Sequence, residues 1–370
     1  MKTQLADIDF LAIKYDNAGT KDQFMGTLKK RIDAYFRENN ISKYGNTFVW
    51  VKIILVLSVF LGSYTLLISN WFSPGVDLLL GIICGISHVL IVMNIGHDAG
   101  HNALSAKNKI NKLMCWSIEI TGISHYMWKL NHNVIHHPYP NVMPVDSELN
   151  MALPFIRIAD VCPKKWYHRY QHFYAPFVYL FFTINLIFMR DFQDSGIFPK
   201  QSSQKTIKHF SARHYVILFL TKLFYLIYAL IIPMLVLSIV WWKVLLGFFI
   251  VHFVMSAIEM CVQLPLHINE NATVVEINDK GVIPNKWYIQ MLEGTSDYLC
   301  ESRIANFITG GINTHTVHHI FPGICHVHYV ELTRILAETS KEFGLPYHKA
   351  PWAKSMVSHF KQLKQLAVQP

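Results

Sequence analysis

The sequence predicts an all-α integral membrane protein with four transmembrane helices in two hairpins, interfacial helices and a cytosolic histidine-rich cap. Hydrophobic residues make up 52% of the 370 residues. Charged residues make up only 15%, whereas soluble domains carry about 25%. Four apolar runs fall into two pairs, and nearly all lysines and arginines lie outside them. This balance excludes a disordered chain, a collagen-like fibre and a small disulfide scaffold.

The first hairpin is predicted from two long apolar stretches joined by a turn. Residues 51–69 are nearly free of charge, and about 20 apolar residues suffice to cross the hydrocarbon core. Pro74 and Gly75 mark the turn, and residues 76–95 form the second span. The preceding residues 1–50 are amphipathic and lack the features of a cleaved signal peptide, so they are expected to stay on the protein.

The central segment and the second hairpin follow from the same reasoning. Residues 113–123 and 174–189 are apolar runs too short for a crossing, which predicts helices in the membrane interface. Residues 215–240 and 243–262 are long enough to form the second hairpin. Two tryptophans stand between them, as is typical of residues at the level of the lipid headgroups.

Basic residues predict the orientation of the spans. Nine lysines and arginines precede residue 53, thirteen lie in residues 96–214 and nine follow residue 262, whereas the turn at residues 70–75 has none. By the positive-inside rule, both termini and the central segment lie in the cytosol. The predicted domains are a cytosolic N-terminal segment (1–50), a membrane domain (51–262) with a central cytosolic segment (96–214), and a cytosolic C-terminal part (263–370).

Histidine is the residue type that the composition singles out, since the chain has 20 histidines and many are clustered. Residues four apart on a helix share a face. The pairs predicted to face one point are His97 with His101, His132 with His136, His315 with His319, and Gln263 with His267. The adjacent histidines at 136–137 and 318–319 point about 100° apart on a helix, so each pair can serve two different metals.

All of these elements leave their spans on the predicted cytosolic side. Nine imidazoles at one membrane face are too many for one ion, so the hypothesis is a dinuclear metal site. Imidazole suits zinc, copper, iron and nickel, and the spacing leaves the metal open. The absence of HExxH disfavours a zinc peptidase, and the six cysteines form no CxxC pair. No block of basic residues indicates nucleic-acid binding.

Three further polar residues lie close to these clusters. Asp98 either hydrogen-bonds a ligand ring or serves as a helix cap or a solvated surface residue, and His326 is expected to orient the last cluster by hydrogen bonds. Glu259 lies within a predicted span, and an intramembrane carboxylate is a candidate functional group. The alternative for Glu259 is an ion pair with Lys222 or Lys243.

The three histidine boxes between two hairpins resemble the membrane fatty acid desaturases, in particular a bacterial group related to front-end desaturases. The resemblance covers nearly the whole chain and is carried by HDAGH (97–101), WKLNHNVIHHPYPN (128–141) and GGINTHTVHHIFPGICHVHY (310–329). It implies a non-haem di-iron site, with the amide of Gln263 near one metal. The implied ligands are His97, His101, His132, His136, His137, His267, His315, His318 and His319. One difference is that front-end desaturases typically have glutamine where this sequence has His315.

The resemblance implies an enzyme of the bacterial inner membrane that introduces a cis double bond into a fatty acyl chain, using O2 and two electrons. The acyl chain is carried by CoA, a lipid or an acyl carrier protein. The expected electron donor is a separate ferredoxin or b-type cytochrome, because the sequence has no His-Pro-Gly-Gly, GxGxxG or CxxC motif. Alternatives on the same scaffold are a hydroxylase and an acetylenase. A haem- or metal-handling membrane protein is the alternative of another class, and clusters on one face disfavour it.

Overall fold

Four helices are long and apolar enough to cross a membrane in the part of the chain that the computed structural model describes, which is residues 13–16, 23–201, 211–278 and 280–369. They are Thr47–Ile68, Pro74–Gly100, Ala212–Val236 and Trp241–His267. Each covers one predicted span, so the predicted fold class is confirmed. The predicted N-terminal segment falls in part on residues 1–12 and 17–22, which lie outside the described residues.

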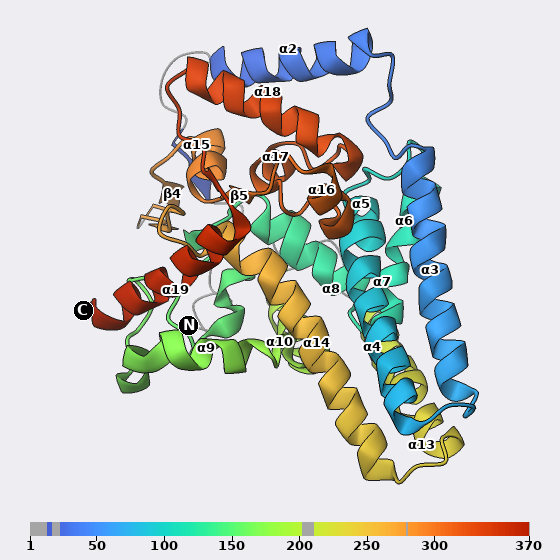
Figure 1. The fold of residues 1–370 in the computed structure, drawn as a ribbon. Helices are drawn as coiled ribbons and strands as arrows, with labels where there is room; N and C mark the ends of the chain where they lie inside the picture. Colours follow the sequence, from blue (N-terminus) through green and yellow to red (C-terminus); the bar gives the residue numbers. More distant parts are fainter. Residues whose placement is uncertain (1–12, 17–22, 202–210, 279, 370) are drawn as a thin grey trace.

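The two hairpins pack side by side, and their long helices form the lower part of the molecule in Figure 1. The first contains α3 (Thr47–Ile68) and α4 (Pro74–Ile91), and the second ends in α14 (Trp241–His267). Helix α4 packs against both α3 and α14. Two π-helices interrupt the spans: η1 (Val92–Gly96) joins α4 to α5 (His97–Gly100), and η6 (Ile227–Ile231) joins α12 (Ala212–Leu226) to α13 (Ile232–Val236).

The central segment consists of short helices, as its short apolar runs predict. Its helices are α6 (Asn108–Cys115), α7 (Ser117–Ile120), α8 (His125–Lys129), η2 (Leu130–His136), η3 (Leu149–Ala152), η4 (Trp166–Tyr170), α9 (Gln171–Tyr179), α10 (Phe182–Asn185), η5 (Leu186–Arg190) and α11 (Asp191–Gln201). The stretch Trp166–Tyr179 meets Phe182–Gly196 at an angle of 73°. Phe173 and Phe177 on α9 are largely exposed, which suits a helix in the membrane interface.

A cap of helices covers the end of the spans that lies away from the hairpin turns. It comprises α2 (Gln23–Glu38), α15 (Trp287–Glu293), α16 (Arg303–Thr309), α17 (His315–Ile320), η7 (His326–His328), α18 (Tyr329–Glu342) and α19 (Trp352–Val368). Helices α2 and α18 lie side by side at the top of Figure 1. Phe24 and Leu28 of α2 share one buried cluster with Leu336 of α18 and Val317 of α17. This apolar contact supports the helix that carries the last histidine box.

Among the described residues, three pairs of two-residue parallel strands join loops that are far apart in the sequence. They are β1 (Lys14–Tyr15) with β4 (Val282–Ile283), β2 (Val142–Met143) with β3 (Val275–Glu276), and β5 (Asp297–Tyr298) with β6 (Lys349–Ala350). The β2–β3 pair fastens the loop after η2 to the loop after α14. Both loops follow helices that carry histidines, so the pairing fixes the relative position of two histidine-bearing elements.

Candidate metal centre

Eight of the nine predicted ligands form two groups of four at the cap end of the spans. Within each group, one possible ligand atom from every residue lies within 4.8 Å of the others. The first group is His97, His101, His132 and His318. The second group is His136, His267, His315 and His319. The structure therefore brings the histidines of all four sequence elements together in two sets.

The ninth predicted ligand, His137, lies between the two groups. Its Nε2 is 3.1 Å from Nε2 of His132 in the first group. Its ring centroid is 4.4 Å from that of His101 in the first group and 4.4 Å from that of His319 in the second. His137 thus contacts both groups, and its Nε2 lies within hydrogen-bonding distance of a ring nitrogen of the first group.

Two of the histidine pairs behave as helical spacing predicts. His97 and His101, at the two ends of the α5 turn, both fall in the first group, and His315 and His319 of α17 both fall in the second. The adjacent pair on α17 is divided between the groups, with His318 in the first. Successive residues of an α-helix are rotated by about 100° about its axis, so α17 presents side chains to both groups.

His132 and His136 belong to different four-histidine groups, yet they also form a group of their own with Glu148, in which one ligand atom of each residue lies within 4.8 Å of the others. The π-helix η2 explains the division between the four-histidine groups, because in it the N–H of His137 donates to the carbonyl oxygen of His132 at 2.8 Å. A π-turn closes its hydrogen bond over five residues instead of four, so His137 takes the place beside His132. His136 is turned toward the second group as a result.

Two carboxylates that the sequence reasoning missed hold the rings of the second box. Oε1 of Glu148 lies 2.7 Å from Nδ1 of His132, and Oε2 of the same residue lies 3.7 Å from Nε2 of His136. Both carboxylate oxygens of Asp146 lie 3.1 Å from Nδ1 of His136. The sequence signal was the pair of acids that follows the box within a dozen residues. A carboxylate on the second ring nitrogen fixes the orientation of a metal-binding imidazole.

Burial sets the charge of most of these rings. It lowers the pKa of His101, His137, His315, His318 and His319 well below the usual histidine value, so these rings are neutral at neutral pH. Neutral imidazole is the form that binds metals. His136 differs: burial acts against its protonated form, but Glu148 and Asp146 raise its pKa to about 9. A metal bound at this ring would displace that proton.

Several buried ring nitrogens have no hydrogen-bond partner among the described residues. They are Nδ1 of His97, His137, His315 and His319, and Nε2 of His101 and His318. Buried polar atoms normally have partners, and so many orphaned nitrogens in one place indicate an absent binding partner. Eight imidazoles with no thiolate in either group suit zinc, copper, iron or nickel and disfavour a calcium-type oxygen site. The residues present therefore fit two metal ions.

Gln263 lies one helical turn before His267 on α14. Its Nε2 donates to Oε2 of Glu259 at 2.7 Å, which leaves the amide oxygen free to face another group. The predicted alternative of a Glu259–Lys222 ion pair is wrong, because Lys222 pairs with Asp191. The alternative partner Lys243 lies sixteen residues before Glu259 on α14, about 24 Å along the helix axis, so it does not pair with Glu259 either.

Asp98 and His326 connect the cap to the first box. Nδ1 of His326 lies 2.7 Å from Oδ2 of Asp98, and Cys325 donates to the same oxygen at 2.9 Å. Nζ of Lys52 lies 3.3 Å from Nε2 of His326. Asp98 therefore bonds cap residues instead of a predicted ligand ring, and His326 reaches the first box through it.

Comparisons with known proteins identify the family of the chain. Residues 69–351 match the family model described as fatty acid desaturase. The chain is 30% identical to an sn-1 linoleoyl-lipid 6-desaturase of Arthrospira platensis, over 94% of this chain and 93% of the relative. It is 27% identical to an acyl-lipid (8-3)-desaturase of Physcomitrium patens, over 96% of this chain and 74% of the relative. An sn-1 linoleoyl-lipid 6-desaturase of Synechocystis sp. is also 27% identical. The chain belongs to the fatty acid desaturase family and is an oxidoreductase.

Proposed function

We propose that this protein is a membrane-bound acyl-lipid desaturase with a non-haem di-iron centre. The observation that supports it most strongly is the pair of four-histidine groups at one end of four membrane-length helices, in a chain of this family. The proposed ligands are the two groups of four together with His137, and Gln263 is proposed to lie near the metal of the second group, directly or through a water.

Two bound irons would supply the redox chemistry that uses O2 and two external electrons to remove two hydrogens from an unactivated acyl chain. The chain's own residues orient and shield the centre. Asp146 and Glu148 hold the rings of His136 and His132. His136 and His319 are each 1% exposed, so bulk water is kept from these two rings of the second group. A dry site protects reactive states from side reactions with water.

The substrate, orientation and partners belong to the same proposal. The relatives named above act on acyl groups of lipids, which favours a lipid over CoA or an acyl carrier protein as the carrier. The distribution of basic residues favours a cytosolic catalytic face in a bacterial inner membrane. A separate ferredoxin or b-type cytochrome would deliver the electrons, and the net charge of +9 favours an acidic donor. Turnover by the purified protein with NADPH alone would contradict the need for such a donor.

The test is expression in a bacterial host that makes no polyunsaturated fatty acids, supplied with linoleate. We expect one new cis double bond in the lipid-linked acyl chains, located by mass spectrometry. Purified protein should contain two irons per chain, and His136→Ala and His318→Ala should each abolish the product while the protein stays in the membrane. A hydroxylated or acetylenic product, a single metal ion or haem absorbance would overturn the proposal.

A further inference from the structure

A pocket of about 240 Å³ lies among the membrane-spanning helices. Its wall is mostly apolar and includes Leu67, Leu78, Ala229, Pro233, Val244 and Phe248. At the inner end, His88 bonds the hydroxyl of Tyr228 at 2.7 Å, and His252 bonds that of Tyr225 at 3.0 Å. These polar groups are therefore engaged with each other, and the interior is suited to a hydrocarbon chain.

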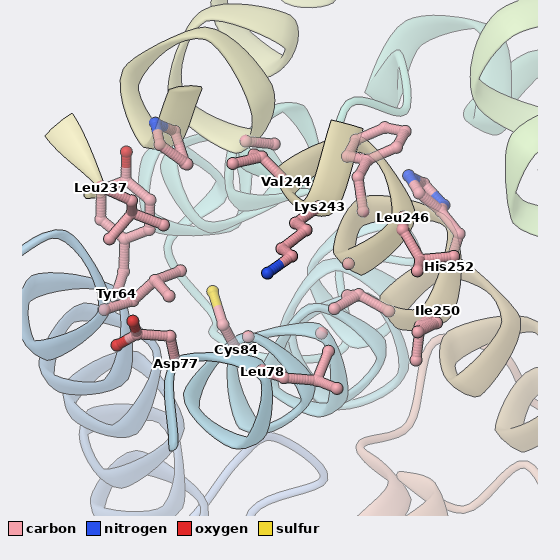
Figure 2. Close-up of a pocket in the computed structure, with 18 of the residues that line it drawn as sticks. Tyr64, Asp77, Leu78, Cys84, Leu237, Lys243, Val244, Leu246, Ile250 and His252 are labelled. Carbon is pink, nitrogen blue, oxygen red and sulfur yellow. The ribbon is translucent and has the colours of Figure 1, made fainter. Parts of the chain in front are cut away.

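Two charged residues line the outer end of this pocket. Figure 2 shows Lys243 between Asp77 and Tyr64 on one side and His252 on the other, and its side chain is exposed at this end of the pocket. The ammonium of Lys243 forms no hydrogen bond or ion pair with any other described residue, and it lies 5.6 Å from the ring centroid of Trp242. Asp77 is 5% exposed, and its Oδ1 has no partner among the described residues.

Both charged residues lie in the first turns of their helices. Asp77 follows Ser73 at the start of α4, and Lys243 follows Val240 at the start of α14. Neither Ser73 nor Val240 provides a side-chain cap, so backbone N–H groups at both helix starts remain available. A cation at a helix N-terminus is unfavourable by itself, whereas an anion there is stabilised. The position of Lys243 is therefore explained by an anion that sits at the pocket mouth.

We propose that this pocket binds a phospholipid from the leaflet away from the metal centre. One acyl chain lies in the apolar interior, the phosphate pairs with Lys243, and a donor group of the headgroup bonds Oδ1 of Asp77. Phosphatidylethanolamine and phosphatidylglycerol have headgroups that combine a phosphate with a nearby hydrogen-bond donor. Phosphatidylcholine has the phosphate without the donor, so the site should discriminate against it.

The charges separate this site from the substrate's path. The methyl end of an acyl chain needs no cation and no carboxylate, whereas both are present here. Asp77 lies twenty residues before His97 on the span Pro74–Gly100, which corresponds to about 30 Å along the helix axis. A headgroup at Lys243 is therefore far from the reacting carbons of any chain held at the histidines.

The test uses full-length protein in phosphatidylcholine nanodiscs with trace lipids that carry a photoreactive group in the acyl chain. Phosphatidylethanolamine and phosphatidylglycerol probes should label peptides from α4 and α14 about five-fold more than the phosphatidylcholine probe, as expected for the net contribution of one hydrogen bond. Asp77→Asn should reduce this preference. Lys243→Ala should lower the labelling about five-fold, and Lys243→Arg should restore it.

A second variant tests the cavity independently of its charge. A Cβ at Gly247 would contact only Leu78, at 3.9 Å, so Gly247→Leu fills the pocket without a backbone clash. It should abolish the labelling, while Lys354→Ala, which removes an exposed lysine from α19, should not change it. Equal labelling by all three phospholipids, or stronger labelling by a photoreactive free fatty acid, would overturn the proposal. Two further results would together overturn it: Gly247→Leu changes the chain length of the product, and a photoreactive substrate labels the pocket. The pocket would then hold the methyl end of the substrate.

Discussion

Asp146 is fully buried and gathers several donors around the second box. It accepts hydrogen bonds from the N–H groups of Asn141 and Glu148, and it lies beside Nδ1 of His136. The carboxylate of Asp146 therefore holds the backbone of the loop after the second box and also orients the ring of His136. Loss of this carboxylate would leave several buried donors without a partner and release the ring.

Replacing Asp146 with alanine should lower metal affinity by about 10- to 100-fold, which is the usual cost of losing the partner of a metal-binding histidine. Asp146→Asn should lose less, since its side-chain oxygen still accepts a hydrogen bond. Metal content after dialysis against a graded chelator measures the difference. Asp33→Ala, which removes an exposed carboxylate on α2, serves as the control and should behave like the wild type.

Asp297 supports the third box in the same way. Its Oδ1 accepts from the N–H of Thr316 at 2.9 Å, in the first turn of α17, and its Oδ2 accepts from Tyr347 at 2.7 Å. Burial raises the pKa of Asp297 to about 6, from a model-peptide value of 3.8. The folded protein therefore holds this proton more tightly than the unfolded chain does.

This difference makes stability depend on pH in a definite direction. The stability of the wild type should fall as pH rises from about 4 to about 6 and stay level above that, with a total change on the order of 3 kcal/mol. Asp297→Asn does not titrate, so its Tm relative to the wild type should rise over the same window. Thermal unfolding in detergent between pH 4.5 and 8 measures it. A difference that stays constant across this range would show that Asp297 is already ionised throughout.

Among the helices, α16 of the cap is in direct contact with η1, the π-helix that precedes the first histidine box. Gly310 ends α16 with a φ of +65°, and a Cβ there would lie 2.2 Å from the carbonyl oxygen of Met93 in η1. The first box begins at His97, immediately after η1. The contact therefore fixes the distance between the first and third boxes, and only glycine allows it.

Gly310→Ala should lower the Tm strongly and reduce metal content, because it combines backbone strain with a clash against backbone. Gly344→Ala is the matched control, since Gly344 has the same φ of +65° but open space around its Cβ position. The control should cost only about 1–2 kcal/mol of stability, the price of the left-handed conformation. Equal losses of stability and metal content in the two variants would mean that the contact with η1 contributes nothing to either.

The whole molecule places its histidine groups at one end of the spans and the apolar pocket among them. The distribution of basic residues predicts that the histidine end faces the cytosol. A cysteine at Ser73, in a Cys261→Ser background, should be labelled from outside by an impermeant thiol reagent, because Cys261 is the exposed native thiol among the described residues. A cysteine at Lys354 should react only after the membrane is opened. The reverse pattern would put the catalytic end outside the cell.

How far the sequence predicts this structure depends on the physical signal at each level. The four spans follow from composition alone, because the bilayer requires long apolar helices. The convergence of the histidines follows from spacing and topology. The division of His132 and His136 between the two four-histidine groups does not follow, since ideal α-helical geometry places both side chains on one face and η2 is a π-helix. Asp146 and Glu148 act across a loop, and periodicity carries no signal for such contacts.

The π-helix η2 has a further consequence for how the centre assembles. It supplies His132 to one group and His136 to the other, while Glu148 contacts both rings. An ion that binds either group would restrict the motion of this helix, so the second ion would cost less conformational entropy on binding. Metal loading should accordingly be cooperative, with half-loaded molecules scarce during titration of the apoprotein.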